Sequence, residues 1–208
     1  MSRPSALFIV FEGGDGAGKS TQVHLLADAL RAAEYAVTVT RQPGGTALGR
    51  SIRDLVLHGD HVSARAEALL FAADKAHHVD QLIQPVGQAG EMVICDRYTD
   101  SSVAYQGAGR ALGADEVQSL QMWAVADLVP DLTVIVDISP AEGRRRRGDT
   151  HDRLEAEEDA FHAAIRAHFL AMAAAYPQRY LVVDGMAPAE HIHEAVCARL
   201  GTLGVHLT

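Results

Sequence analysis

The chain has 208 residues, of which 48% are hydrophobic and 22% charged, values typical of one soluble globular domain. This composition excludes a disordered or collagen-like chain, and no apolar run approaches the roughly 20 residues needed to span a bilayer. The formal net charge of -9 argues against a general binder of nucleic-acid polymers or of anionic membranes.

The cysteines and the N-terminus indicate a reduced setting. Cys95 and Cys197 are too few for a disulfide framework or a zinc site. The first residues lack the basic stretch and long apolar segment of a secretory signal. We therefore expect a cytoplasmic protein that folds as one domain over residues 1–208 and has no membrane partner.

Short apolar runs alternate with longer amphipathic stretches along the chain. The strand candidates are Ala6–Phe11, Ala36–Thr40, Met92–Cys95, Leu132–Val136 and Tyr180–Val183. Nearly all of their residues are apolar, which is typical of strands buried on both faces of a parallel sheet. The helix candidates are Lys19–Ala33, Ala64–Gln84, Glu155–Tyr176 and Pro188–Leu203. This alternation predicts a three-layer α/β fold around a five-stranded parallel sheet.

In such a sheet, ligands bind beyond the carboxyl ends of the strands. The segments 12–20, 41–46 and 96–98, and the residues after Asp137, follow predicted strands and carry most of the polar chemistry. We expect these four segments to meet at one edge of the sheet.

The first of these segments, Gly13–Ser20, matches the phosphate-loop pattern G-x-x-x-x-G-K-[ST], between a predicted strand and a predicted helix. Its glycines let successive backbone N–H groups face phosphate oxygens, helped by the positive end of the helix. Lys19 is predicted to reach the β- and γ-phosphates, and the Ser20 hydroxyl to bind Mg²⁺. A glycine-rich turn with an incidental lysine is the alternative. The predicted ATP-binding residues are Gly13, Gly14, Asp15, Gly16, Ala17, Gly18, Lys19, Ser20 and Thr21.

Other nucleotide-binding classes fit the sequence less well. The chain has no Asn-Lys-x-Asp pattern of the kind that reads guanine in GTPases, and helicase or transporter ATPases are normally larger. Lys19 and Lys75 are the only lysines among 18 basic residues, and Arg144–Arg147 form a run of four. Genomic base composition can explain the excess of arginine, but it does not explain the place of the lysines. A small P-loop nucleotide kinase is favoured.

Five motifs, taken together, resemble the thymidylate (dTMP) kinase family, in its order and at its spacing over about residues 6 to 185. They are Phe11–Thr21, Arg41–Thr46, Leu70–Lys75, Asp96–Gly107 and Asp152–Glu155. The resemblance implies a homodimeric enzyme that transfers the γ-phosphoryl group of ATP to dTMP, with Mg²⁺, and yields dTDP and ADP.

Two pairs of residues have physical reasons for a role in binding the acceptor. Arg97 follows Asp96 at the end of a predicted strand and can hold the acceptor's α-phosphate as a bidentate fork, unless it forms a surface salt bridge. Asp96 can orient Mg²⁺ through water. Phe71 and Lys75 lie four residues apart and share one helix face. Without a resemblance to a known family, the residues favour a core position for Phe71 and a solvated position for Lys75.

The resemblance implies a complete acceptor site. In it, Phe71 stacks on thymine, and Lys75 occupies a position where an arginine usually bonds the base. Ser102 and Tyr105 meet the base edge and the sugar, and Asp15 accepts a hydrogen bond from the 3′-hydroxyl. The predicted acceptor residues are Asp15, Arg41, Phe71, Lys75, Arg97, Ser102, Tyr105 and Gln106.

A lid over about residues 142–155, between a helix and the next helical stretch, is predicted to supply further cations. Residues 14–17 of the phosphate loop contain no cation, and the resemblance is to the kinases whose lid provides one. The predicted catalytic residues are Lys19, Arg97, Arg147 and Arg153, and the spacing does not decide which lid arginine acts.

Two departures from the family pattern leave other functions open. Gln42 stands where glutamate is common, and Lys75 replaces the usual arginine. The alternatives are a kinase of a modified deoxyuridylate and a homologue that binds nucleotides without catalysis.

Several remaining residues have no predicted role in catalysis. His77, His78, His191 and His193 lack partners at zinc spacing and are expected on the surface. Met122 and Trp123 are expected in the core or in a dimer interface.

Overall fold

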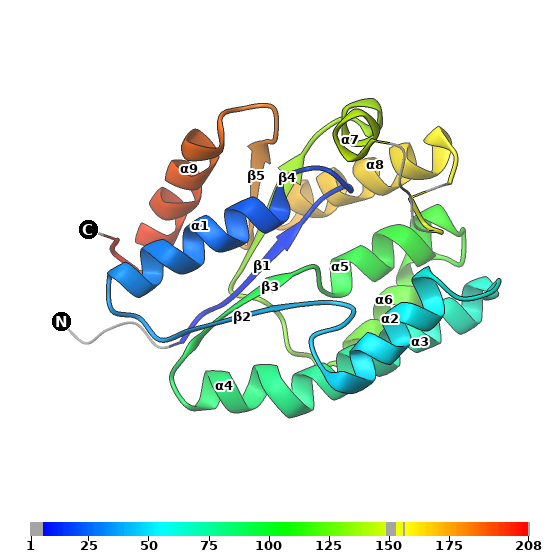
Figure 1. The fold of residues 1–208 in the computed structure, drawn as a ribbon, viewed down its shortest axis with the longest axis horizontal. Helices are drawn as coiled ribbons and strands as arrows, with labels where there is room; N and C mark the ends of the chain where they lie inside the picture. The colour runs from blue at the N-terminus through cyan, green and yellow to red at the C-terminus, as the bar shows by residue number, and fades with distance from the viewer. Residues whose placement is uncertain (1–5, 149–152, 156, 208) are drawn as a thin grey trace.

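A five-stranded parallel sheet forms the centre of the molecule, in the order β2-β3-β1-β4-β5 (Figure 1). The structure is a computed structural model that describes residues 6–148, 153–155 and 157–207. The strands are β1 (Phe8–Glu12), β2 (Val37–Arg41), β3 (Met92–Asp96), β4 (Leu132–Asp137) and β5 (Tyr180–Asp184). Each coincides with a predicted strand. β1 is buried along its whole length, and β3 and β4 are buried except for their last residues, as expected for strands covered on both faces.

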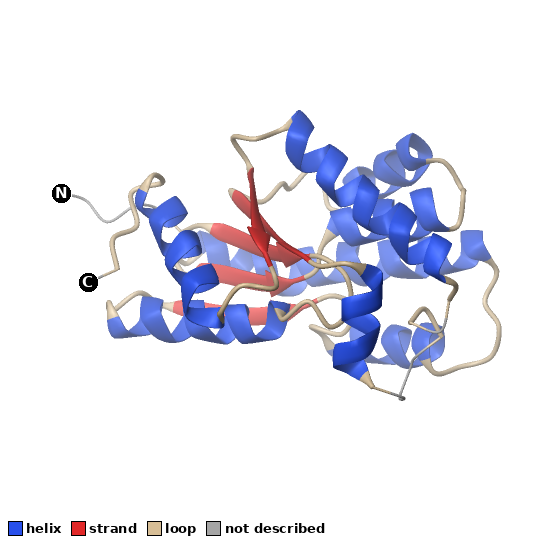
Figure 2. Ribbon diagram, turned by 90° about the horizontal axis from the view of Figure 1, so that it is seen from above, coloured by secondary structure: helices blue, strands red, loops and turns tan. Residues whose placement is uncertain are grey.

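Helices follow the strands and pack against both faces of the sheet. They are α1 (Lys19–Ala32), α2 (Ala47–Leu57), α3 (Ala64–His78), the π-helical segment η1 (Val79–Ile83), α4 (Gln84–Gln88), α5 (Thr99–Ser102), the π-helical segment η2 (Val103–Gly109), α6 (Ala114–Ala124), α7 (Pro140–Arg147), α8 (Asp159–Ala175) and α9 (Ala189–Gly201). Figure 2 shows helices on both sides of the sheet and a further group beyond one end of its strands.

Separate apolar cores form on the two faces of the sheet. On one face, α1 and α9 pack against each other and bury Leu26 and Val196 with Phe11 of β1. On the other face, α8 packs on β4 and β5 and buries Ile165 and Phe169. The three-layer α/β fold around a five-stranded parallel sheet is therefore confirmed.

Three helix predictions need correction. The helix predicted over 64–84 was expected to end at Pro85, but the helical stretch continues through α3, η1 and α4 to Gln88. Pro85 lies in the first turn of α4, where a missing N–H is tolerated. The helix predicted from Glu155 begins only at Asp159. The run Arg144–Arg147 is predicted to lie between two helices, but it forms the second half of α7.

The local sequence explains why α7 is helical. The Ser139 side chain accepts a hydrogen bond from the Glu142 N–H, Pro140 occupies the first turn, and Glu142 pairs with Arg145 and Arg146 one turn later. Of the proposed lid, residues 149–152 lie outside the described part of the chain. None of the helices in the described part combines the length and apolar character needed to cross a bilayer.

Candidate active site

The phosphate loop lies between β1 and α1, as predicted, and its shape depends on its glycines. Gly13, Gly16 and Gly18 have φ of 132°, 78° and 98°, which disfavour any residue with a side chain. A Cβ on Gly13 would lie 2.4 Å from the Val136 carbonyl oxygen of β4. The loop therefore sits directly on the sheet edge, with the N-terminus of α1 behind it.

Lys19 and Ser20 open α1 and line the same pocket, which we call the phosphate pocket. Lys19 Nζ donates to the carbonyl oxygens of Gly13 and Gly14 at 3.1 and 2.8 Å. Burial and the neighbouring Arg97 lower the pKa of Lys19, while acidic neighbours act the other way. The lining residues are Asp15, Gly16, Ala17, Gly18, Lys19, Ser20, Thr21, Arg41, Gln42, Arg53, Asp96, Arg97 and Arg146.

Asp96 reaches this pocket because β3 lies beside β1. The register pairs Asp96 with Phe11 of β1 and with Arg41 of β2, so all three strands end at one level. The Ser20 hydroxyl donates to Asp96 Oδ2 at 2.9 Å. A hydroxyl and a carboxylate thus lie together at the mouth of the phosphate pocket.

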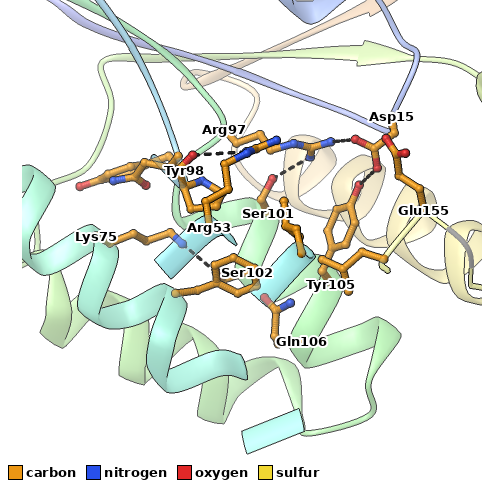
Figure 3. A pocket seen from close by; sticks show the side chains of 15 residues that line it. Asp15, Arg53, Lys75, Arg97, Tyr98, Ser101, Ser102, Tyr105, Gln106 and Glu155 are labelled. Atoms are coloured by element: carbon orange, nitrogen blue, oxygen red, sulfur yellow. Dashed lines mark hydrogen bonds and ion pairs between the residues drawn. The ribbon is translucent and has the colours of Figure 1, made fainter. Parts of the chain in front are cut away.

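Arg97 follows β3 in a left-handed conformation, with φ of 70°, which is unusual for a residue with a side chain. Its guanidinium donates to Gly13 O at 3.2 Å and Ser101 Oγ at 3.0 Å, and it forms an ion pair with Asp15 (Figure 3). Tyr105 places its ring 5.2 Å from the guanidinium carbon and donates its hydroxyl to Asp15 at 2.8 Å.

Asp15 is the common partner of these groups. Burial opposes its ionisation, but Arg97 and Lys19 outweigh this effect and hold the pKa of Asp15 well below its usual range. The Asp15 carboxylate is therefore charged at neutral pH and fixes Arg97 and Tyr105 in place.

A second pocket, which we call the inner pocket, opens between α3, α5 and η2 (Figure 3). Phe71 and Lys75 share one face of α3 at its wall, as their spacing predicts, and both are buried. Lys75 Nζ lies 5.5 Å from the centre of the Phe71 ring and donates to Ser102 Oγ at 2.8 Å. Gln106 donates to the buried Glu67 at 2.8 Å.

One further cation at the two pockets was not predicted from the sequence. Arg53 of α2 lines both pockets and donates to Pro43 O at 3.3 Å. Ile52 and Val56, one turn apart, carry a helical signal that could have revealed α2 and the adjacent arginine. Arg41, expected in the acceptor site, is exposed and lines only the phosphate pocket of the two.

The prediction of a surface position was wrong for His78, which is fully buried. Its ring nitrogens lie 2.7 Å from Thr40 Oγ1 and 2.8 Å from Gln42 Nε2. Burial lowers the pKa of His78 to about 4, so the ring is neutral. Gly45 makes this contact possible, since a Cβ there would lie 2.4 Å from the ring.

The predicted lid arginines occupy different places. Arg147 is largely buried, with its guanidinium 4.0 Å from Asp15, whereas Arg146 lines the phosphate pocket. Arg153 forms an ion pair with the buried Glu67 and donates to Val56 O at 2.9 Å. The structure therefore brings Lys19, Arg97 and Arg147 around Asp15 but does not bring Arg153 there.

Comparison with known proteins identifies this arrangement. The family model for thymidylate kinase matches residues 11–196. A thymidylate kinase of Leifsonia xyli is 53% identical over 204 residues, covering 96% of each chain. The chain belongs to the thymidylate kinase family.

Other thymidylate kinases support the same assignment. That of Cutibacterium acnes is 50% identical over 196 residues, covering 93% of this chain and 96% of the relative. The crystal structure of thymidylate kinase from Ehrlichia chaffeensis superposes with a TM-score of 0.79 at 32% identity, covering 97% of this chain and all of that one.

The buried ammonium of Lys75 generates a prediction about stability. Burial lowers its pKa to about 8, so the unfolded chain binds more protons than the folded chain between about pH 8 and pH 10. The folded state therefore gains stability as the pH rises through this window. In urea unfolding at stepped pH, the unfolding free energy of the wild type minus that of Lys75→Met should increase by about 3 kcal/mol. A difference that stays flat across the window would contradict the buried charge.

Proposed function

We propose that the thymidylate kinase activity of this chain, transfer of the γ-phosphoryl group from ATP to dTMP, takes place where the phosphate pocket meets the inner pocket. The observation that carries this proposal is the set of side chains shared by both pockets. Asp15, Gln42, Arg53 and Arg97 line both. Phosphate groups held in the two pockets would therefore meet beside Arg97.

The donor side follows from the phosphate loop. The backbone N–H groups of residues 13–18 and the N-terminus of α1 would bind the ATP phosphates, with Ser20 and Thr21 at the start of the helix. Lys19 Nζ donates to carbonyl oxygens of the loop and would instead donate to the β- and γ-phosphate oxygens when ATP binds. Little covalent chemistry is needed, because positioning and neutralising the transferred group account for most of the catalysis.

The acceptor side follows from the inner pocket. The Phe71 ring would stack on the thymine base, and the polar groups of Lys75 and Ser102 would contact the base edge. Tyr105 and Asp15 would contact the sugar, and Gln106 would close the pocket. Arg97 would hold the acceptor phosphate as a bidentate fork, with Arg53 and Arg41 beside it. The acceptor phosphate oxygen would then attack the γ-phosphorus in line, and the bond from the γ-phosphorus to the β,γ-bridging oxygen would break as ADP leaves.

The residues at the mouth of the phosphate pocket fit Mg²⁺. The Ser20 hydroxyl and the Asp96 carboxylate lie 2.9 Å apart, and hard oxygen ligands of this kind suit that ion. Mg²⁺ bound there would neutralise charge on the nucleotide phosphates. Asp96 would act through water, as in other P-loop enzymes.

Arginines of the segment 142–155 would complete the catalytic site. Arg147 is the better supported candidate because it already lies beside Asp15. Arg153 is the other candidate, and to act on the transferred phosphate it would have to leave its ion pair with Glu67.

A homodimer is the proposed assembly. Leu55 of α2, Leu69 of α3 and Trp123 of α6 are between 51% and 81% exposed, and α3 packs against both α2 and α6. A largely exposed tryptophan with neighbouring exposed leucines is typical of a protein–protein interface.

The free thiols of Cys95 and Cys197 support a cytoplasmic location.

A coupled assay of ADP release over dTMP, dUMP, 5-substituted deoxyuridylates and dCMP tests the function. We expect dTMP to be preferred, and Lys19→Ala to lower kcat by about 10³-fold with an unchanged circular dichroism spectrum. Arg31→Ala, which removes an exposed cation from the other end of α1, is the control. Preference for another monophosphate would refute dTMP as the acceptor, and full turnover in Lys19→Ala would refute the role of Lys19.

The two candidate arginines can be separated by kinetics and stability together. Arg147→Ala should lower kcat by about 10²-fold or more with little loss of stability. Arg153→Ala leaves a buried carboxylate with one cation fewer, so its main effect should be on unfolding, at about 3 kcal/mol. Steady-state kinetics and urea unfolding of both variants decide the assignment. A large kcat loss confined to Arg153→Ala would give the catalytic role to Arg153 instead.

Sedimentation velocity tests the dimer. Trp123→Glu places a charge on the exposed apolar surface and should convert a dimer to a monomer at micromolar concentration. Val182→Glu, an equivalent change at an exposed position of the edge strand β5, is the matched control. A wild-type chain that sediments as a monomer would rule the assembly out.

A further inference from the structure

Glu12 is a fully buried carboxylate at the end of β1, and it lines neither the phosphate pocket nor the inner pocket. Its Oε1 accepts hydrogen bonds from the backbone N–H groups of Tyr98 and Ser101, at 2.8 and 3.1 Å. Its Oε2 accepts from Ser101 Oγ at 2.6 Å. A buried charge with three donors is a costly feature, and all three donors belong to the segment that follows Arg97.

This carboxylate supplies the cap that α5 lacks. Tyr98 occupies the N-cap position of α5 but provides no side-chain cap. Because Arg97 is in the left-handed region, the chain turns sharply between β3 and α5 and exposes N–H groups there. Glu12 binds two of these groups from a neighbouring strand. The unusual backbone of Arg97 is thus held by a residue 85 positions earlier.

The side-chain contacts set the direction of the Arg97 guanidinium. An ionised carboxylate can only accept, so Ser101 must donate its single hydroxyl proton to Glu12. The lone pairs of Ser101 Oγ are then free to accept from Arg97 Nη1, at 3.0 Å. The other end of the fork, Nη2, pairs with Asp15. Glu12 therefore determines the donor-to-acceptor direction of the hydrogen bonds that link Arg97 to Ser101 and Ser101 to Glu12.

The surroundings of Glu12 act on its pKa in opposite directions. Burial and Asp100 raise the pKa of Glu12 to about 7, while Arg97, Ser101 and Tyr98 lower it. Asp100 is itself engaged by the Tyr180 hydroxyl, at 2.7 Å. The groups that Glu12 orients are therefore the groups that favour its ionised form.

We propose that Glu12 and Ser101 are positioning residues for acceptor binding, which act by fixing the backbone and the guanidinium of Arg97 towards the acceptor phosphate. This inference rests on the proposed role of Arg97 as the holder of that phosphate. Glu12 lines neither pocket, whereas Ser101 lines the inner pocket and acts here through its contact with Arg97. Their effect is on the affinity for the monophosphate and not on the binding of ATP.

The test compares Ser101→Ala, Ser101→Thr and Glu12→Gln at pH 8, above the pKa of Glu12, with KM measured for each substrate. Ser101→Ala removes the acceptor of Arg97 Nη1 and should raise the KM for dTMP about tenfold while the KM for ATP stays within twofold. Ser101→Thr keeps the hydroxyl and should restore the wild-type value. In Glu12→Gln an N–H₂ group faces Ser101 and competes with Arg97, so the KM for dTMP should again rise. Ser119→Ala, a serine of α6 outside both pockets, is the control.

Arg97→Ala separates failure of this inference from failure of the proposed function. If Arg97→Ala leaves dTMP binding by calorimetry unchanged, the proposed role of Arg97 is wrong. If Arg97→Ala weakens dTMP but Ser101→Ala does not, only the positioning role is overturned. Equal increases in both KM values for Ser101→Ala would likewise overturn it, since they would indicate a general structural defect. In the Arg97→Ala background, Ser101→Ala should have no further effect on dTMP affinity.

Discussion

The parallel pairing of β1 with both β3 and β4 is the constraint on which the site depends. The register sets Phe11 opposite Asp96 and Glu12 opposite Ile135, so β1 and β3 end within one residue of each other and β4 continues for two residues more. The segments that follow these strands begin side by side at one edge of the sheet. The phosphate loop, Arg97 and α7 meet there because of strand register, and no long loop has to fold back to bring them together.

Charge balance at that edge follows from the same pairing. Lys19 and Arg97 share one pocket, where burial and the neighbouring Arg97 disfavour the charged form of Lys19. Asp15 and Glu12, at opposite sides of the guanidinium, offset this repulsion. The distribution explains how a chain of net charge -9 holds a cation-rich pocket. The acidic residues inside the fold stabilise the cations that are to face phosphate.

The parts of the molecule that could be predicted from the sequence rest on local signals. Continuous apolar runs indicated the five strands, the glycine–lysine pattern indicated the phosphate loop, and a spacing of four placed Phe71 and Lys75 together. The burial of His78 could not be predicted in this way. Its partners Thr40 and Gln42 lie 38 and 36 residues away, so only the tertiary structure brings the end of α3 into contact with them. Arg53 was missed for a related reason, because α2 itself was not recognised.

One face of α3 carries three buried polar side chains beside Phe71. Glu67, Lys75 and His78 are all buried on this helix, and each binds a side chain of another segment. Buried polar groups are costly unless they are paired, so each contact excludes alternative positions of the helix. An ammonium has three donors around one point, and Lys75 gives one of them to Ser102. In the proposed acceptor site, the remaining donors would be available to a thymine carbonyl near Phe71, without the planar fork of an arginine.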